Sequence, residues 1–225
     1  MKQSIPRPGF RRADRRTLNA ERGTRNLERP PAKITGVILA GGRGQRMGGV
    51  DKGLKLLRGR PMIAWVIERF APQVDELLVN ANQNLDQYAQ LGYRVIPDAL
   101  EGFAGPLAGL QSALAEARHG LVATAPCDSP YLPLDLIERL HGAMQRGEAD
   151  LAVAKTGAQA HPIFCLCRKS VSSSLTEFLA GGGRKIDAWY ARLKVAEVAF
   201  DDNPAAFSNI NTEADLAALE SHPPA

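Results

Sequence analysis

The residues best suited to chemistry lie in one glycine-rich segment, which reads LAGGRGQRMGGVDKG from Leu39 to Gly53. It combines six glycines with three cationic side chains, those of Arg43, Arg46 and Lys52. Glycines let backbone N–H groups approach an anion closely, and cations neutralise charge that backbone dipoles alone cannot balance. The segment therefore predicts a phosphate-binding loop.

Two common phosphate-binding motifs do not fit this segment. The dinucleotide fingerprint needs a glycine where Met47 stands, and the Walker pattern needs Gly-Lys-Ser/Thr where the chain has Asp51-Lys52-Gly53. An NAD-dependent enzyme and a P-loop NTPase are therefore both disfavoured. A flexible surface loop with solvated arginines is the alternative, and the buried strand predicted just before the segment argues against it.

Polar side chains also follow three other apolar runs of the sequence. Asn80, Asp98 and Asp128 each come at or just after the end of such a run. Because parallel strands present their carboxyl ends at one edge of a sheet, we expect these residues to share a cleft with the glycine-rich segment. A hard divalent cation takes one or two carboxylates together with water and phosphate oxygens, so Asp128 is the candidate Mg²⁺ ligand. The alternative is that Asp128 only caps a turn.

Several other residues could carry chemistry but have a simpler explanation. The stretch 209–212, Asn-Ile-Asn-Thr, fits a second metal or substrate contact equally as well as a turn with a helix cap. Cys165 and Cys167 share one face of an apolar strand, which favours burial over metal or redox chemistry. Among the histidines, His161 adjoins the expected cleft, and none is expected to be a general base.

The elements that must position these residues alternate from residue 34 onward. The run 34–40 is continuously apolar, which is typical of a parallel strand buried on both faces. Strands are predicted over 34–40, 76–81, 93–97, 120–125, 151–155, 163–168 and 195–200, and helices over 61–70, 85–91, 106–118, 134–145, 171–179 and from 212 onward. The alternation predicts an α/β fold: a single Rossmann-like, three-layer α/β/α domain with a mostly parallel sheet.

Charge divides the chain into two parts. Residues 1–33 hold ten basic and three acidic side chains, several prolines and no apolar periodicity, which predicts a disordered basic N-terminal extension. Its paired arginines are not followed by the hydrophobic run of an export signal. Residues 34–225 carry a net charge of −3 within the total of +4, and this acidic body argues against nucleic acid as a partner.

Composition also bears on the compartment. No apolar run approaches the ~20 residues needed to cross a bilayer, so no association with a membrane is expected. Three cysteines, Cys127, Cys165 and Cys167, are too few for a disulfide framework or a four-ligand zinc site. Both observations favour the cytoplasm.

The chain from about residue 34 to the C-terminus resembles the molybdenum cofactor guanylyltransferases, a family of the nucleotide-diphospho-sugar transferase-like superfamily. Many nucleotidyltransferases share LAGG followed by Arg-Met, whereas GGVDKG at 48–53 is far more particular to this family. Further matches occur in the same order as in the family: VNAN at 79–82, VIPD at 95–98, GPLAG at 105–109, PCDSPY at 126–131, HP at 161–162 and NINT at 209–212. The resemblance implies that residues 34–225 form a nucleotidyltransferase domain with the fold of that superfamily.

The reaction implied by the resemblance is transfer of GMP from Mg-GTP to molybdopterin, with release of pyrophosphate. It implies nucleotide contacts by Leu39, Ala40 and Gly41, with Gly42 beside them, nucleoside contacts by Asn80 and Asp98, a phosphate contact by Lys52, and Mg²⁺ at Asp128. From charge alone we add Arg43 and Arg46, because an acidic body needs local cations to accept a triphosphate. The candidate catalytic residues are then Lys52, Asp128 and Arg46, and Arg184 and Lys185 are weaker candidates for the pterin phosphate.

Two other functions stay open from the residues alone. A related transferase could use CTP or a sugar-phosphate acceptor, because the choice of base depends on pocket geometry that sequence spacing does not fix. Outside enzymes, the chain could be a non-catalytic adaptor that binds a nucleotide or cofactor, or an RNA-binding protein that acts through its basic tail. The expected partners are GTP and molybdopterin, with transient contacts to cofactor-delivery chaperones or apo-molybdoenzymes.

Overall fold

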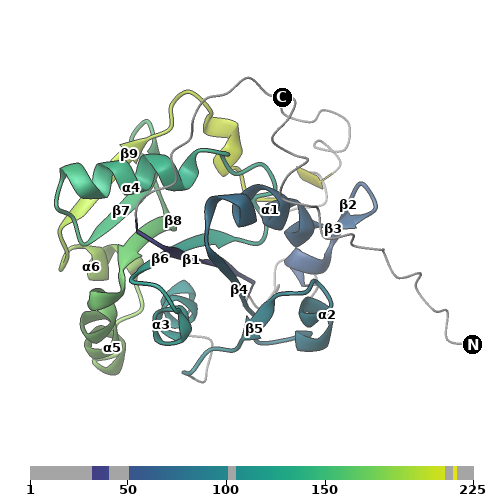
Figure 1. The fold of residues 1–225 in the computed structure, drawn as a ribbon, viewed down its shortest axis with the longest axis horizontal. Coiled ribbons are helices and arrows are strands. Elements are labelled where there is room, and N and C mark those ends of the chain that lie inside the picture. The colour runs from purple at the N-terminus through teal and green to yellow at the C-terminus, as the bar shows by residue number, and fades with distance from the viewer. Residues whose placement is uncertain (1–31, 41–50, 101–104, 211–214, 217–225) are drawn as a thin grey trace, which may run out of the picture.

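The computed structural model describes residues 32–40, 51–100, 105–210 and 215–216. These residues form a seven-stranded sheet in the order β5-β4-β1-β6-β8-β7-β9 and a small two-stranded sheet, β2-β3 (Figure 1). The predicted basic extension up to residue 31 lies outside the described residues. So do Gly41, Gly42, Arg43 and Arg46 of the predicted phosphate loop.

The strands are β1 (Ile34–Leu39), β2 (Leu56–Leu57), β3 (Arg60–Pro61), β4 (Glu76–Asn80), β5 (Arg94–Ile96), β6 (Leu121–Pro126), β7 (Leu151–Thr156), β8 (Gln159–Arg168) and β9 (Val195–Ala199). The helices are α1 (Met62–Phe70), α2 (Leu85–Ala89), α3 (Pro106–Glu116), α4 (Leu136–Arg146), α5 (Ser172–Ala180) and α6 (Ile186–Tyr190). Short 3₁₀ helices cover Lys52–Leu54, Ala71–Gln73, Lys169–Val171 and Pro204–Phe207. Every strand and helix predicted within the described residues is present, with ends that differ by a few residues.

The sheet is mostly parallel, as predicted. Strands β5, β4, β1 and β6 run parallel to one another, and β7 runs parallel to β9. Strand β8 is antiparallel to both of its neighbours, β6 and β7. The reason is the connection: only two residues join β7 to β8, and so short a loop permits a hairpin but not a crossover.

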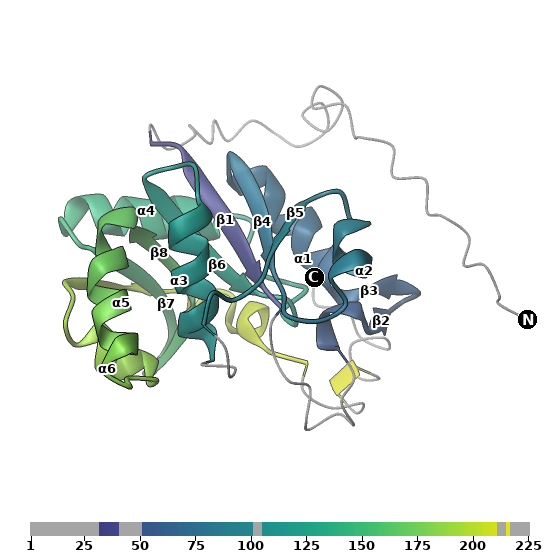
Figure 2. The same ribbon diagram turned by 90° about the horizontal axis from the view of Figure 1, so that it is seen from below.

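Helices cover both faces of the sheet and give the three predicted layers. On one face, α1 and α4 pack on side chains such as Ile38, which alternates along β1 with Val37 on the other face. The second face is covered by α3, α5 and α6. Figure 2 shows α3 and α5 on the near side of the sheet, with α1 and α4 behind it. Among the described residues, no helix has the length and apolarity needed to cross a membrane.

Four parallel strands end level with one another. Leu39, the last residue of β1, pairs with Asn80 of β4 on one side and with Pro126 of β6 on the other. Asn80 in turn pairs with Ile96, the last residue of β5. This register brings the segments that follow the four strands to a single edge of the sheet, where the sequence predicts the site.

Candidate functional site

Lys52 and Asp128 form an ion pair at this edge. Lys52 lies in the 3₁₀ turn Lys52–Leu54, and Asp128 lies two residues beyond the end of β6. The Nζ atom of Lys52 is 3.2 Å from Oδ2 of Asp128, and their side chains are 24% and 13% exposed. A cation and a carboxylate that are both partly accessible can receive a phosphate group and a metal ion, respectively. The structure thus brings together the two side chains for which the sequence predicted these roles.

Asn80 and Asp98 meet on the other side of β1. The Nδ2 group of Asn80 donates to Oδ1 of Asp98 at 2.9 Å and to the carbonyl oxygen of Ile96 at 3.2 Å. Asn80 is buried, and it has room because Gly109 of α3 lies against it. A Cβ atom on Gly109 would lie 2.3 Å from Oδ1 of Asn80. The predicted pair is therefore in contact, and a glycine of the GPLAG stretch makes the contact possible.

Asn82 completes this network, although the sequence analysis gave it no role. Its Nδ2 group donates to Oδ2 of Asp98 at 2.8 Å, and its Oδ1 atom accepts from the backbone N–H of Asp98 at 2.8 Å. With Asn80 on Oδ1 and Asn82 on Oδ2, both carboxylate oxygens of Asp98 are held. The signal available in the sequence was the VNAN stretch, whose second asparagine lies just beyond the end of β4.

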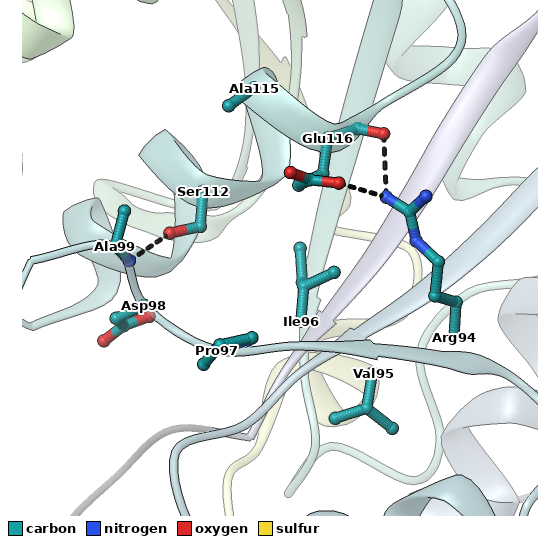
Figure 3. A pocket seen from close by; sticks show the side chains of 9 residues that line it. All are labelled: Arg94, Val95, Ile96, Pro97, Asp98, Ala99, Ser112, Ala115 and Glu116. Atoms are coloured by element: carbon teal, nitrogen blue, oxygen red, sulfur yellow. Dashed lines mark hydrogen bonds and ion pairs between the residues drawn. The ribbon is translucent and has the colours of Figure 1, made fainter.

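A pocket of about 440 Å³ adjoins this network along β5 and α3 (Figure 3). Asp98 and Ala99 lie at one end of it, and the ion pair of Arg94 with Glu116, at 2.7 Å, lies at the other. The Oγ atom of Ser112 accepts from the N–H of Ala99 at 2.8 Å and so ties the segment after β5 to α3. The pocket meets the site through Asp98 and Ala99.

The C-terminal segment is attached to the Asp128 loop. The N–H of Ile210 donates to the carbonyl oxygen of Asp128 at 3.1 Å, and Ser129 donates its hydroxyl to Oδ1 of Asn209 at 2.7 Å. Asn209, one of the two asparagines of the predicted NINT stretch, therefore lies beside the loop that carries Asp128. The other, Asn211, lies outside the described residues, as does Thr212.

The remaining candidate residues are buried, stacked or hydrogen-bonded within the fold. Cys165 and Cys167 are buried, and burial raises the pKa of both thiols, as expected for core cysteines. His161 stacks on Phe207 with ring centres 4.7 Å apart, and burial lowers the pKa of its imidazole. Arg184 donates to the carbonyl oxygens of Leu179, at 2.9 Å, and Gly183, at 2.6 Å. The guanidinium of Arg184 thus caps the end of α5, and its contact with a pterin phosphate stays a prediction.

The described residues of this edge offer few side-chain ligands for a metal ion. Within residues 32–40, 51–100, 105–210 and 215–216, no group of three or more His, Cys, Asp or Glu side chains could hold a metal ion. A single carboxylate at Asp128 instead suits Mg²⁺, which commonly binds through one or two carboxylates and completes its shell with substrate phosphates and water. The donor set therefore fits a cation that arrives with a phosphorylated substrate.

The sequence is similar to a known protein family and to curated proteins of that family. Residues 36–195 match the family model described as the MobA-like NTP transferase domain. A curated protein named molybdenum cofactor guanylyltransferase from Shewanella putrefaciens is 50% identical over 182 residues, covering 81% of this chain and 93% of its own length. One of the same name from Bordetella petrii is 51% identical over 190 residues, covering 83% and 96%.

Solved structures show the same fold. The crystal structure of molybdopterin-guanine dinucleotide biosynthesis protein A from Archaeoglobus fulgidus superposes with a TM-score of 0.69 at 27% identity, covering 84% of this chain and 97% of that one. A nucleotidyl transferase from Methanothermobacter thermautotrophicus superposes with a TM-score of 0.67 at 18% identity, covering 84% and 97%, and supports the fold alone. The predicted nucleotide-diphospho-sugar transferase type of fold is thereby confirmed.

Proposed function

The chain belongs to the MobA-like NTP transferase family, and we propose that it transfers GMP from GTP to molybdopterin, as a molybdenum cofactor guanylyltransferase. The observation that carries this proposal is the Lys52–Asp128 pair, which lies at the strand edge beside the Asn80–Asp98 network. This arrangement offers a cation for phosphate, a carboxylate for a metal and a polar platform for a nucleoside. Full-length relatives at about 50% identity that carry the same activity in their names support it.

The chemistry needs no side-chain nucleophile. A terminal phosphate oxygen of molybdopterin attacks the α-phosphorus of GTP, the bond from that phosphorus to the oxygen bridging to the β-phosphate breaks, and pyrophosphate leaves. The protein has to align two anions and stabilise charge on the transferring group. Lys52 does this as a phosphate ligand, and Arg46 and Arg43 add positive charge from the preceding loop.

Asp128 is the residue that would hold Mg²⁺. A bound Mg²⁺ would offset negative charge on the triphosphate. Asp128 suits this role because its carboxylate is partly accessible and its loop is held by the contacts of Ser129 and Ile210 with the C-terminal segment. These contacts hold the backbone at Asp128 and at Ser129, the residue that follows it.

The nucleoside lies, in this proposal, against Asp98 and Asn80. Because both oxygens of Asp98 are already held by amide groups, its carboxylate has a fixed orientation from which the remaining lone pairs accept from hydroxyl or N–H groups of the nucleoside. Backbone groups of Leu39, the last residue of β1, and of Ala40, Gly41 and Gly42 after it complete the nucleotide site. This preorganisation favours binding because fewer groups lose freedom when GTP arrives.

The molecular setting is part of the same proposal. Residues 34–225 form the nucleotidyltransferase domain and residues 1–33 precede it as a basic extension. The enzyme works in the cytoplasm, where it passes its product to cofactor-delivery chaperones or directly to apo-molybdoenzymes.

Pyrophosphate release from the purified protein tests the proposal. The assay contains molybdopterin and Mg²⁺, with GTP and CTP supplied in separate reactions, and a parallel series contains a chelator. We expect release that requires GTP, molybdopterin and Mg²⁺ together. Release with CTP but not with GTP would assign the chain to the related cytidylyl chemistry. The absence of release with either nucleotide would favour a binding protein.

A further inference from the structure

The carboxylate of Asp51, the residue before Lys52, receives three hydrogen bonds. Its Oδ1 atom accepts from the N–H of Gly53 at 3.2 Å and from the hydroxyl of Tyr88, and its Oδ2 atom accepts from Nδ2 of Asn84 at 3.0 Å. Asp51 thereby caps the 3₁₀ turn that contains Lys52. It also ties that turn to α2, the helix that carries Tyr88.

Gly53, on the other side of Lys52, is packed against the same tyrosine. A Cβ atom at Gly53 would lie 2.5 Å from the hydroxyl oxygen of Tyr88 and 3.3 Å from both Cβ and Sγ of Cys127. Cys127 immediately precedes Asp128. The backbone on both sides of Lys52 is therefore fixed relative to Tyr88, and Gly53 packs directly on the loop that carries the partner of Lys52.

Tyr88 is suited to act as a fixed donor. Its side chain is fully buried in the core cluster that also contains Ala40, Ala81 and Cys127. Burial raises the pKa of its phenol, so the hydroxyl stays protonated and continues to donate to Asp51. A buried tyrosine with no other role would need a partner for its hydroxyl, but that partner need not be the cap of the turn that carries Lys52.

We propose that Tyr88, acting through Asp51, is a positioning residue that holds the Lys52 turn so that the ammonium group faces Asp128 and the phosphates of the nucleotide. This inference rests on the proposed role of Lys52 as a phosphate ligand. Without the tyrosine hydroxyl, the N–H of Gly53 is the remaining donor to Oδ1 of Asp51 among the described residues, and the hydrogen bond that joins the turn to Tyr88 of α2 is lost. A small misplacement of a charged group that must align a substrate is costly to the reaction.

A double-mutant cycle separates positioning from general stabilisation. Tyr88→Phe removes one hydroxyl and keeps the ring in the core, and we expect it to lower kcat/KM for GTP about tenfold. In a Lys52→Ala background the same substitution should change kcat/KM less than about twofold, because the group that it positions is already missing. The GTP dissociation constant, measured over the same four proteins, should show the same coupling without requiring turnover.

Tyr190→Phe is the matched control. The hydroxyl of Tyr190 donates to the carbonyl oxygen of Pro162 at 2.7 Å, and neither residue contacts Lys52, Asp51 or Asp128 through any hydrogen bond of the described chain. Its removal should lower the melting temperature to a similar extent and leave kcat/KM for GTP unchanged. Asn84→Gly is a second test that does not disturb the core, because Asn84 is exposed and its φ of 52° suits glycine. We expect it to weaken GTP binding about twofold.

Three outcomes are decisive. The positioning role is wrong if Tyr88→Phe changes kcat/KM and the GTP dissociation constant by the same factor with and without Lys52. It is also wrong if Tyr88→Phe changes neither quantity. If the wild-type protein binds GTP but releases no pyrophosphate, the proposed function fails. In that case coupling in the dissociation constants would still support the positioning of Lys52, and additivity would overturn it.

Discussion

At the scale of single residues, the proposed reaction depends on the negative charge of Asp128. The carboxylate of Asp128 contacts Nζ of Lys52 and lies on a loop whose backbone is held by Ile210. The carbonyl oxygen of Asp128 and the hydroxyl of Ser129 anchor this loop to the C-terminal segment. The carboxylate of Asp128 takes no part in that anchoring. Its charge and its shape can therefore be tested separately.

Asp128→Asn is expected to reduce GTP-dependent turnover at least about 100-fold, because it keeps the shape of the side chain and removes the charge that binds Mg²⁺. The melting temperature should change little, since the backbone contacts of the loop remain. Turnover is measured by pyrophosphate release, and stability by thermal unfolding of the same preparation. A variant that retains more than a tenth of wild-type turnover would rule out Asp128 as the metal ligand.

Several residues of the site could be predicted and others could not. The positions of Asn80, Asp98 and Asp128 were predictable because each ends or follows a strand whose apolar pattern is plain. Lys52 was predicted from the glycine-rich segment with its cationic side chains. The contacts of Asn82 with Asp98 were not predictable, because they depend on how two loops from different strands meet. Pairings of this kind arise from tertiary packing, which local sequence does not encode.

At the scale of elements, helix α3 provides the surface on which Asn80 rests. Gly109 lies in the interior of this helix, where glycine costs about 1 kcal/mol relative to alanine. The space that it leaves is filled by Asn80 and by Leu39, whose Cδ2 atom would lie 3.0 Å from an added Cβ. We interpret the glycine as a requirement of the site rather than of the helix.

Gly109→Ala is expected to weaken GTP binding about tenfold or more, because the added methyl group displaces the buried side chain of Asn80 and breaks its contact with Asp98. Gly142→Ala in α4 is the control, since the nearest atom to its Cβ is the end of the flexible Arg146 side chain, at 3.2 Å. The control should bind GTP normally and be more stable by about 0.5–1 kcal/mol. Equal GTP affinity in both variants would show that Asn80 does not contribute to nucleotide binding.

The positions of the helices and strands were easier to predict from the sequence than the way the strands pair in the sheet. Strand β1 and helix α1 have apolar patterns that specify them, and both lie where predicted. Strand β8 was predicted only from residue 163, although it begins at Gln159, and its antiparallel direction was not predicted. The half-exposed start of that strand lacks a continuous apolar run, and its direction is set by the hairpin with β7.

At the scale of the whole molecule, two histidines whose pKa is lowered by burial, His141 and His161, link stability to pH. His141 is buried in α4, and its pKa lies below its ordinary value of 6.5, first because of burial and then because of the charge on Arg168. Burial lowers the pKa of His161 as well. In the unfolded chain both imidazoles take up a proton as the pH falls through about 6.5, whereas in the folded protein they resist it.

The contribution of these histidines to the free energy of unfolding should therefore be complete above pH 7. It should decrease as the pH falls from about 6.5 toward 5, because the unfolded state binds more protons there. His141→Gln should have a shallower pH dependence over this interval than the wild-type protein. Urea unfolding at a series of pH values measures both. An unchanged slope in the variant would mean that His141 does not contribute to the pH dependence.

In the proposed reaction, the whole enzyme joins the nucleotidyl part of GTP to molybdopterin. The most direct measurement follows GTP labelled at the α-phosphorus, incubated with the full-length protein, Mg²⁺ and molybdopterin. We predict that the label appears in a guanine dinucleotide form of the pterin while unlabelled pyrophosphate is released, and that Asp128→Asn abolishes both. Label that stays in GTP, or that appears only as free GMP, would contradict it.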